Sequence, residues 1–164
     1  MIVITHNSHA TSDLGETLSL KRKVLPGQVL ALHGDLGTGK TVFCRGFAKG
    51  LGITEPVTSP TFNIVQEYPL PDGNSLFHLD LYRINNDSEA IAFGIDEYLF
   101  NPKAYTLIEW PERIPGLLGN RAVDIVFEHL SADQRIITFP DSLTPLGIGF
   151  KFGWGVSLLK RRED

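Results

Sequence analysis

The stretch Gly34-Asp35-Leu36-Gly37-Thr38-Gly39-Lys40-Thr41 decides the fold of this chain. It matches the phosphate-binding loop pattern G-x-x-x-x-G-K-[ST] at every fixed position. The apolar run Val29-Leu30-Ala31-Leu32 precedes it, and a segment with helical periodicity follows it. This strand–loop–helix order points the N–H groups of the loop and the positive end of the helix dipole at an anion. The stretch therefore predicts a P-loop nucleotide site.

Each part of the loop has an expected contact with a nucleotide. Backbone N–H groups of residues 36–41 would face the phosphates, and Lys40 would reach the β- and γ-phosphates. Thr41 would offer its hydroxyl to Mg²⁺. The loop thus predicts cofactor binding by Asp35, Leu36, Gly37, Thr38, Gly39, Lys40 and Thr41.

Length, composition and charge exclude several classes of protein. The chain has 164 residues, of which 42% are apolar and 21% charged, and this suits one globular domain. Its formal net charge of −4 argues against a dedicated nucleic-acid binder, which normally carries a basic face. No apolar run is long enough for a membrane helix, and the N-terminus does not resemble a signal peptide. We therefore expect a cytoplasmic protein without membrane attachment.

The single cysteine, Cys44, supports the same compartment. One cysteine allows no internal disulfide, as is usual in a reducing cytosol. Because Cys44 falls in the helix after the loop, we interpret it as a small packing residue.

Strands and helices alternate along the chain, which favours an α/β sheet. Ser12 or Asp13 is expected to cap a helix that buries Leu14, Leu18 and Leu20, and Ser88 a short helix that ends near Phe93. A further helix is expected at 40–50. Strands are expected at 2–5, 28–33, 62–68, 75–81, 104–109, 122–128 and 134–139.

We expect a single-domain P-loop NTPase with a mostly parallel central sheet flanked by helices. The turn Pro71-Asp72-Gly73-Asn74 predicts an antiparallel hairpin, and a second hairpin is expected at 122–139. Residues 1–140 would form the P-loop domain. Residues 141–164 would form a C-terminal tail, for which the pattern predicts no structure.

A P-loop needs a second anchor for Mg²⁺, usually an acidic residue at the end of a neighbouring apolar strand. Glu109 ends the run Tyr105-Thr106-Leu107-Ile108, which matches that geometry. Asp80 is the other candidate, because period-2 alternation places it on one face with His78 and Tyr82. Spacing favours Glu109 as the metal ligand beside Thr41. The two acids could also divide the work, one ordering the metal and one orienting the attacking water.

Hydroxyl residues surround Pro60. Ser59 is held out of a helix because it precedes a proline, and Ser59 and Thr61 could both sense the γ-phosphate or its metal. The same residues also suit an ordinary turn, and the pattern alone does not decide between the two.

Five segments in this order resemble the TsaE family (also called YjeE), small bacterial P-loop ATPases of tRNA threonylcarbamoyladenosine synthesis. The resemblance covers roughly residues 10–115 and leaves the tail unmatched. The segments are the loop from Gly34 to Thr41, Val57-Thr58-Ser59-Pro60-Thr61-Phe62, Phe77-His78-Leu79-Asp80-Leu81-Tyr82-Arg83, Gly94-Ile95-Asp96-Glu97-Tyr98 and Leu107-Ile108-Glu109-Trp110-Pro111-Glu112-Arg113.

The resemblance implies slow, Mg²⁺-dependent ATP hydrolysis in support of the TsaD and TsaB proteins, with any tRNA contact indirect. On this pattern Thr41 and Glu109 hold Mg²⁺, and Lys40 and Asp80 act with Glu109 in catalysis. The resemblance also implies that Ser59 and Thr61 lie on a switch-like loop, that Trp110 lines the nucleotide site and that Thr11 lies near the adenine.

Two other classes of protein share the P-loop. Small-molecule kinases usually carry an arginine-rich lid, whereas the arginines here are scattered, at Arg83, Arg113, Arg121 and Arg135. A GTPase would carry an Asn-Lys-x-Asp motif, for which Asn85-Asn86-Asp87 is a poor substitute. We prefer an ATPase and keep a small-molecule kinase or a nucleotide-dependent switch protein as the alternative.

Overall fold

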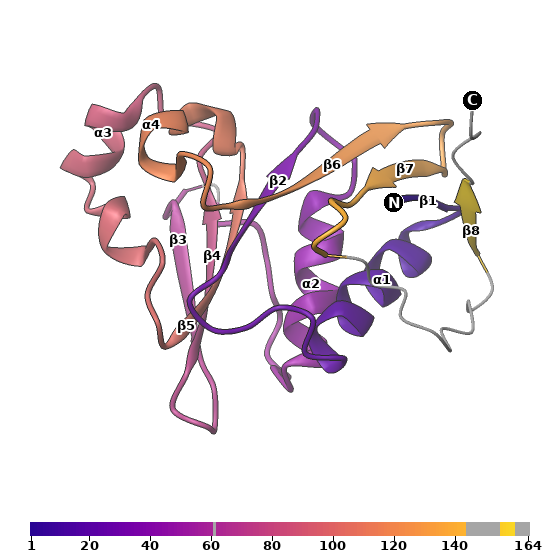
Figure 1. Ribbon diagram of the computed structural model, residues 1–164, viewed down its shortest axis with the longest axis horizontal. Helices are drawn as coiled ribbons and strands as arrows, with labels where there is room; N and C mark the ends of the chain where they lie inside the picture. The colour runs from indigo at the N-terminus through magenta and orange to yellow at the C-terminus, as the bar shows by residue number, and fades with distance from the viewer. Residues whose placement is uncertain (61, 144–154, 160–164) are drawn as a thin grey trace.

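The described strands of this computed structural model form one eight-stranded sheet, in the order β3-β4-β5-β2-β6-β7-β1-β8 (Figure 1). Residues 1–60, 62–143 and 155–159 are described. The strands are β1 (Ile2–Thr5), β2 (Val29–His33), β3 (Val65–Pro69), β4 (Ser75–Asp80), β5 (Ala104–Glu109), β6 (Val123–His129), β7 (Arg135–Thr138) and β8 (Val156–Leu159). The helices are α1 (Ser8–Leu20), α2 (Lys40–Gly50), α3 (Asp87–Ala92) and α4 (Pro115–Leu118), with 3₁₀ turns η1 (Ile95–Tyr98) and η2 (Pro111–Arg113).

The middle of the sheet is parallel and its margins are antiparallel. Strands β4, β5, β2 and β6 run parallel to one another. At one margin β3 pairs antiparallel with β4, and at the other β7, β1 and β8 continue antiparallel beyond β6. The expected α/β fold with a parallel centre and added antiparallel hairpins is confirmed.

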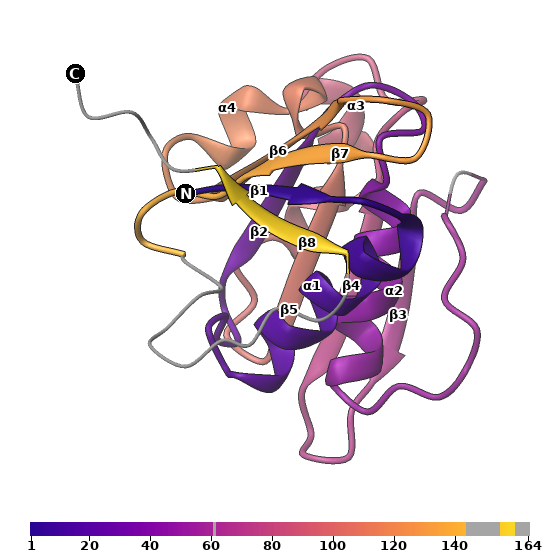
Figure 2. The same cartoon turned by 90° about the vertical axis from the view of Figure 1, so that its right-hand side faces the viewer.

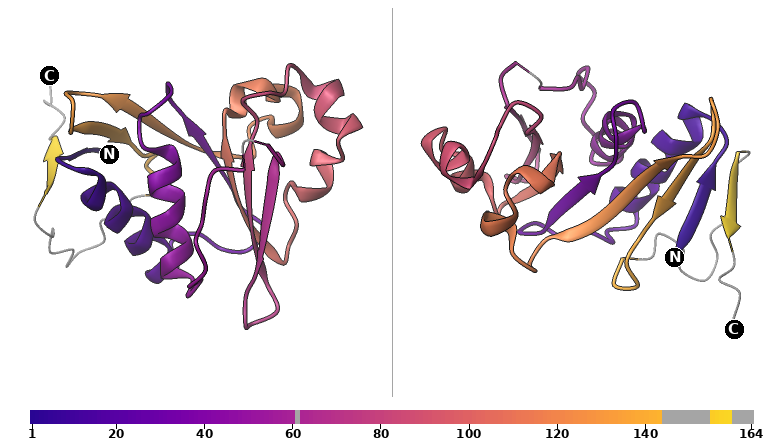
Figure 3. Two further views of the ribbon diagram at one scale, coloured as in Figure 1. Left: turned by 180° about the vertical axis from the view of Figure 1, so that it is seen from behind. Right: turned by 90° about the horizontal axis from the view of Figure 1, so that it is seen from above.

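Helices cover both faces of this sheet. Helices α1 and α2 lie side by side on one face, and α3 and α4 lie toward the other (Figures 1 and 3). Strand β2 shows how the sequence builds both layers. Leu30 and Leu32 join the core beneath α1 and α2, whereas Val29 and Ala31 join the core beneath α3 and α4. A strand buried on both faces has no polar positions, which explains its uninterrupted apolar run.

The contact between α1 and α2 depends on glycine. A Cβ atom on Gly46 of α2 would lie 1.8 Å from the carbonyl oxygen of Ser12, and one on Gly15 of α1 would lie 2.3 Å from that of Phe43. Glycine has no side chain, so the two helix backbones can approach closely at both positions. This contact fixes α1 against the helix that follows the P-loop.

Two helices begin earlier than expected. Asn7, not Ser12 or Asp13, caps α1, because its side chain accepts a hydrogen bond of 2.8 Å from the amide of Ala10. Asn86 likewise caps α3 in place of Ser88. Leu14 and Leu18 are buried as expected, but Leu20 at the end of α1 is 61% exposed, so its predicted place on the buried face is wrong.

Part of the expected tail forms strand β8, which pairs antiparallel with β1 at the edge of the sheet (Figure 2). The backbone N–H of His6 donates to the carbonyl of Gly155 at 2.8 Å, and its ring nitrogen Nε2 lies 2.8 Å from the hydroxyl of Ser157. The rest of the tail beyond Leu143 lies outside the described residues.

Candidate functional site

A cavity of about 430 Å³ lies where β4 and β5 end and α2 begins. The parallel strands place their carboxyl ends at this edge, the usual position of a ligand in an open α/β sheet. The cavity is lined by Leu36, Gly37, Thr38, Gly39, Lys40, Thr41, Val42, Ser59, Asp80, Tyr82, Glu109 and Trp110. Most of the site residues predicted from the sequence therefore meet around one space.

The P-loop keeps its shape because glycines take conformations that other residues avoid. Gly37 and Gly39 have φ angles of 77° and 98°, in the left-handed region. Gly34 has φ 144°, and a Cβ atom there would lie 2.4 Å from the carbonyl oxygen of Phe127. The Thr38 hydroxyl closes the turn by donating to the carbonyl of Asp35 at 2.7 Å. This backbone forms a cradle at the start of α2.

Lys40 lies inside this cradle and is only 4% exposed. Its ammonium donates to the carbonyls of Gly34 and Asp35, the second at 2.9 Å, and lies 4.4 Å from the centre of the Trp110 ring. Burial lowers the pKa of Lys40, while nearby carboxylates, Glu109 first among them, act in the opposite direction. Within the described part of the chain, Lys40 forms no ion pair. It is thus a buried cation that only neutral groups contact directly.

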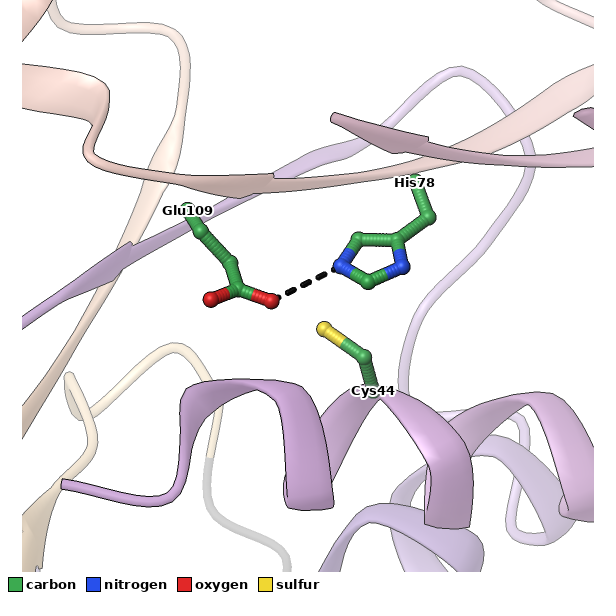
Figure 4. A group of neighbouring side chains, drawn as sticks. All are labelled: Cys44, His78 and Glu109. Carbon is green, nitrogen blue, oxygen red and sulfur yellow. Dashed lines mark hydrogen bonds and ion pairs between the residues drawn. The ribbon is translucent and has the colours of Figure 1, made fainter. Parts of the chain in front are cut away.

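Glu109 connects three elements at the base of the cavity. The Thr41 hydroxyl at the start of α2 donates to both of its carboxylate oxygens, at 2.8 and 3.1 Å. On the other side Nε2 of His78, from β4, lies 2.8 Å from Oε1 (Figure 4). Glu109 and His78 are 4% and 0% exposed. The carboxylate is therefore held between a hydroxyl that faces the cavity and a fully buried imidazole.

Asp80 forms the other acidic wall of the cavity. The Ser59 hydroxyl donates to its Oδ2 at 2.7 Å, and the backbone N–H of Tyr82 donates to its Oδ1 at 3.0 Å. These contacts fix one carboxylate oxygen to the loop that carries Ser59 and the other to the backbone just after β4. Thr61, predicted to lie on the same loop, is outside the described residues.

Trp110 forms an aromatic wall next to Asp80. Its φ of 62° places it in the left-handed region directly after β5. Its ring centre lies 5.1 Å from that of Tyr82, at an angle of 59°. Trp110 thus contacts both Lys40 and Tyr82 and lines the same cavity.

A second cavity of about 200 Å³ shares residues Gly37, Gly39 and Val42 with the first. Thr11 lines it from α1, and the hydroxyl of Thr11 lies 2.8 Å from that of Thr5. Arg135 lines its other side and donates to the carbonyl of Gly37 at 3.2 Å. The P-loop therefore lies between two cavities. Asp80, Glu109 and Lys40 line the first, and Thr11 lines the second.

Asp35 stands apart from the other predicted residues. Its side chain is exposed and lines neither cavity, and its backbone carbonyl is the group that accepts from Thr38 and Lys40.

Sequence reasoning did not identify two residues of the site. Period-2 alternation placed His78 on the face of Asp80, but no pattern linked it to Glu109, 31 residues away. Arg135 contacts Gly37 across 98 residues, and no local motif marks it. Both contacts arise from strand order, which a single sequence does not specify.

None of the helices in the described parts of the chain combines the length and the apolarity needed to cross a membrane.

The chain is similar in sequence and in structure to known proteins. The family model described as "Threonylcarbamoyl adenosine biosynthesis protein TsaE" matches residues 5–137. A Bacillus subtilis relative named tRNA threonylcarbamoyladenosine biosynthesis protein TsaE is 48% identical over 70% of this chain and 70% of its own. A Rickettsia bellii relative of the same name is 38% identical over 68% and 76%. The crystal structure of Bacillus subtilis YdiB matches with a TM-score of 0.68 and 37% identity, over 85% of this chain and 83% of that one.

Proposed function

This chain belongs to the TsaE family, and from this membership we propose that it is the ATP-binding, slowly ATP-hydrolysing component of tRNA N6-threonylcarbamoyladenosine biosynthesis. The name of its relatives supports the pathway. One observation carries the activity: Lys40, Thr41, Asp80 and Glu109 surround one cavity at the mouth of a P-loop.

The P-loop backbone and Lys40 fit a triphosphate. Gly39 precedes the first N–H groups of α2 and has no side chain that could cap them, so these groups suit phosphate oxygens. Among the described residues, the Lys40 ammonium contacts two carbonyls and one ring, which it can exchange for phosphate oxygens. Thr11 and Arg135 border the adjoining cavity, which we assign to the adenosine end of the nucleotide.

Thr41 and Glu109 fit Mg²⁺. A hydroxyl and a carboxylate are hard oxygen ligands, which Mg²⁺ prefers, and their oxygens lie 2.8 and 3.1 Å apart at the edge of the phosphate cradle. When bound, Mg²⁺ would neutralise charge on the β- and γ-phosphates. Thr41 and Glu109 would position that ion and form no covalent bond to the substrate.

Asp80 is the residue we assign to orienting the attacking water. Its carboxylate lines the same cavity as the P-loop, within which a water that attacks the γ-phosphate would have to lie. Ser59 and the Tyr82 amide fix its orientation. Ser59 then couples this carboxylate to the loop before Phe62, which gives the loop a means to respond to the γ-phosphate.

The residues that line the cavity are also consistent with slow ATP hydrolysis by the isolated chain. Of the described residues that line it, none is an arginine. An arginine finger accelerates phosphoryl transfer by ~10³–10⁵. We propose that TsaD-like and TsaB-like proteins of the cytoplasm bind this chain and control its turnover, and that its contact with tRNA is indirect.

Nucleotide turnover tests this function. Phosphate release should require Mg²⁺ and ATP, need no acceptor molecule, and rise when the TsaD-like and TsaB-like proteins are added. Lys40→Ala should weaken ATP binding by at least about tenfold, because each hydrogen bond to a charged group contributes about 1.5–3 kcal/mol. The matched control is Lys49→Ala, which removes an exposed lysine at the far end of the same helix.

Two results would overturn the proposal. Equal ATP affinity in Lys40→Ala and the wild type would refute the phosphate site. Phosphate transfer to an added small molecule, without release to water, would instead indicate a P-loop kinase.

A further inference from the structure

Next to the nucleotide cavity lies a second group of potential metal ligands, of which the proposed nucleotide chemistry uses only Glu109. The sulfur of Cys44, a ring nitrogen of His78 and a carboxylate oxygen of Glu109 lie within 4.8 Å of one another, and all three residues are buried. They come from α2, β4 and the end of β5. In Figure 4 the Cys44 sulfur points at the pair formed by His78 and Glu109.

We propose that Cys44, His78 and Glu109 form a reversible inhibitory site for a thiophilic divalent cation, with Zn²⁺ as the expected ion. Thiolate, imidazole and carboxylate are the three ligand types that Zn²⁺ takes in proteins. A ligand set with sulfur does not suit Mg²⁺, which prefers oxygen. The inhibitory part rests on the function proposed above, because Glu109 belongs to both sites.

Charge balance favours a divalent ion at this position. Zn²⁺ with the Cys44 thiolate and the Glu109 carboxylate gives a neutral cluster, and neutrality avoids the large cost of a buried net charge. The thiol proton leaves to solvent when the sulfur binds the metal. Burial, with the nearby carboxylates of Glu109 and Asp80, raises the pKa of the Cys44 thiol. Lys40 and Arg45 act in the opposite direction but by less, so a bound cation would add the positive charge needed to favour the thiolate.

The geometry needs only a small adjustment. Zinc lies about 2.3 Å from sulfur and about 2.0–2.2 Å from nitrogen or oxygen, so two atoms bound to one zinc lie closer than 4.8 Å. Nε2 of His78 and Oε1 of Glu109 are already 2.8 Å apart. Movement of the Cys44 side chain toward this pair would complete the three-ligand set.

The surroundings of His78 limit the affinity of this site for zinc. A metal-bound histidine usually donates its other ring N–H to a partner. Within the described parts of the chain, Nδ1 of His78 is buried and has no hydrogen-bond partner. Once Nε2 binds the metal, the proton of neutral His78 resides on Nδ1, at a cost of about 1–3 kcal/mol. This cost makes the site a reversible one, weaker than a structural zinc site.

Occupation would act on the nucleotide site through Glu109. Oε1 of Glu109 also accepts from Thr41, the other residue that we assign to Mg²⁺. A zinc ion on the Cys44 side would draw this carboxylate away from Thr41 and repel a second cation. We therefore expect zinc to oppose Mg²⁺-dependent hydrolysis without occupying the P-loop.

Binding of Co²⁺, a spectroscopic substitute for Zn²⁺, tests the site without requiring activity. Because Cys44 is the only cysteine, a thiolate-to-cobalt charge-transfer band from the full-length protein can come only from this residue. We expect one equivalent of Zn²⁺ to abolish the band. Cys44→Ser should eliminate it and lower zinc affinity by at least about 100-fold, since even loss of an outer partner of a metal ligand costs about 10–100-fold.

His33→Gln is the matched control. His33 is partly exposed and lies 2.7 Å from Asp124, so it represents adventitious surface binding. The control should keep the cobalt band and the zinc affinity. Absence of the band in the wild type, or equal zinc affinity in Cys44→Ser, would overturn the site.

Phosphate release at buffered free zinc tests the inhibition separately. Saturating zinc should reduce the rate of ATP hydrolysis by the wild type at least tenfold. It should change the rate of the Cys44→Ser variant less than twofold. Equal inhibition of both proteins would refute the link to Glu109. A wild type with the cobalt band but without hydrolysis would refute the proposed ATPase and leave the metal site standing.

Discussion

The hydroxyl of Thr41 donates to both carboxylate oxygens of Glu109, so the first residue after the P-loop lysine and the last residue of β5 share one interaction. The register of the parallel strands brings this about. Leu32 of β2 pairs with Glu109, so the end of β5 lies beside the strand that leads into the P-loop. The fold itself thus brings together the two oxygen groups proposed to bind Mg²⁺.

Glu109→Ala should abolish the effect of Mg²⁺ on ATP affinity. We expect Mg²⁺ to strengthen ATP binding to the wild type by at least about tenfold, the lower end of the effect of disturbing a metal site, and to leave the variant unchanged. Titration calorimetry with and without Mg²⁺ measures both values. Glu112→Ala is the control, because its half-exposed carboxylate points to His33. An undiminished Mg²⁺ effect in Glu109→Ala would contradict the assignment.

Asp80→Asn should bind ATP but hydrolyse it slowly. Asparagine retains an oxygen that can accept from the Tyr82 amide, so the loop should keep its shape. The loss of the carboxylate should lower the rate constant of hydrolysis by about 10²–10⁴-fold, the usual contribution of a general base. Single-turnover phosphate release gives this rate at saturating ATP.

Ser59→Ala is the matched control for Asp80. It removes one hydrogen bond to the carboxylate and should slow hydrolysis by only about fivefold, equivalent to about 1 kcal/mol. Hydrolysis by Asp80→Asn at the wild-type rate would show that another group orients the water.

Local patterns predicted much of the fold and the site. The P-loop and the apolar run before it placed β2 and α2, and β5 lies at the expected 104–109. The position of Glu109 beside the P-loop was predictable because an acid at the end of a neighbouring buried strand is a common feature of P-loop proteins, and the structure places it against Thr41. These features depend on residues close together in the sequence.

The remaining features depend on contacts between distant segments. His78 lies next to Glu109 because β4 and β5 are neighbours in register, with Asp80 opposite Glu109. Strand β8 forms from Val156-Ser157-Leu158-Leu159, a segment too short and too close to glycines to stand out, because the edge of β1 offers it backbone partners. Asn7 rather than Ser12 begins α1, since several residues there could cap a helix and packing selects one.

Cys44 should make the folded protein less stable in alkaline solution. Burial raises the pKa of this thiol well above its ordinary value, so the folded chain keeps the proton at pH values where the unfolded chain has lost it. Stability is therefore unaffected below the ordinary thiol pKa and falls as pH rises through it. The slope is at most about 1.4 kcal/mol per pH unit.

Denaturant unfolding between pH 7 and pH 10 measures this slope. Lysines and tyrosines also titrate in this range, so the informative quantity is the difference between the wild type and Cys44→Ser. That difference should shrink as pH rises, because serine does not titrate. Parallel stability curves would show that the thiol has an ordinary pKa in the folded protein.

Trp110 should report nucleotide binding through its fluorescence. The Lys40 ammonium lies 4.4 Å from the ring centre, and phosphate binding should draw this cation away from the ring toward the phosphate oxygens. The chain has two tryptophans, Trp110 and Trp154, of which Trp154 lies outside the described residues. We expect ATP to change the emission of the wild type and of Trp154→Phe to the same extent, and that of Trp110→Phe by less than a tenth as much. A nucleotide signal that persists in Trp110→Phe and disappears in Trp154→Phe would place the responding tryptophan outside the cavity.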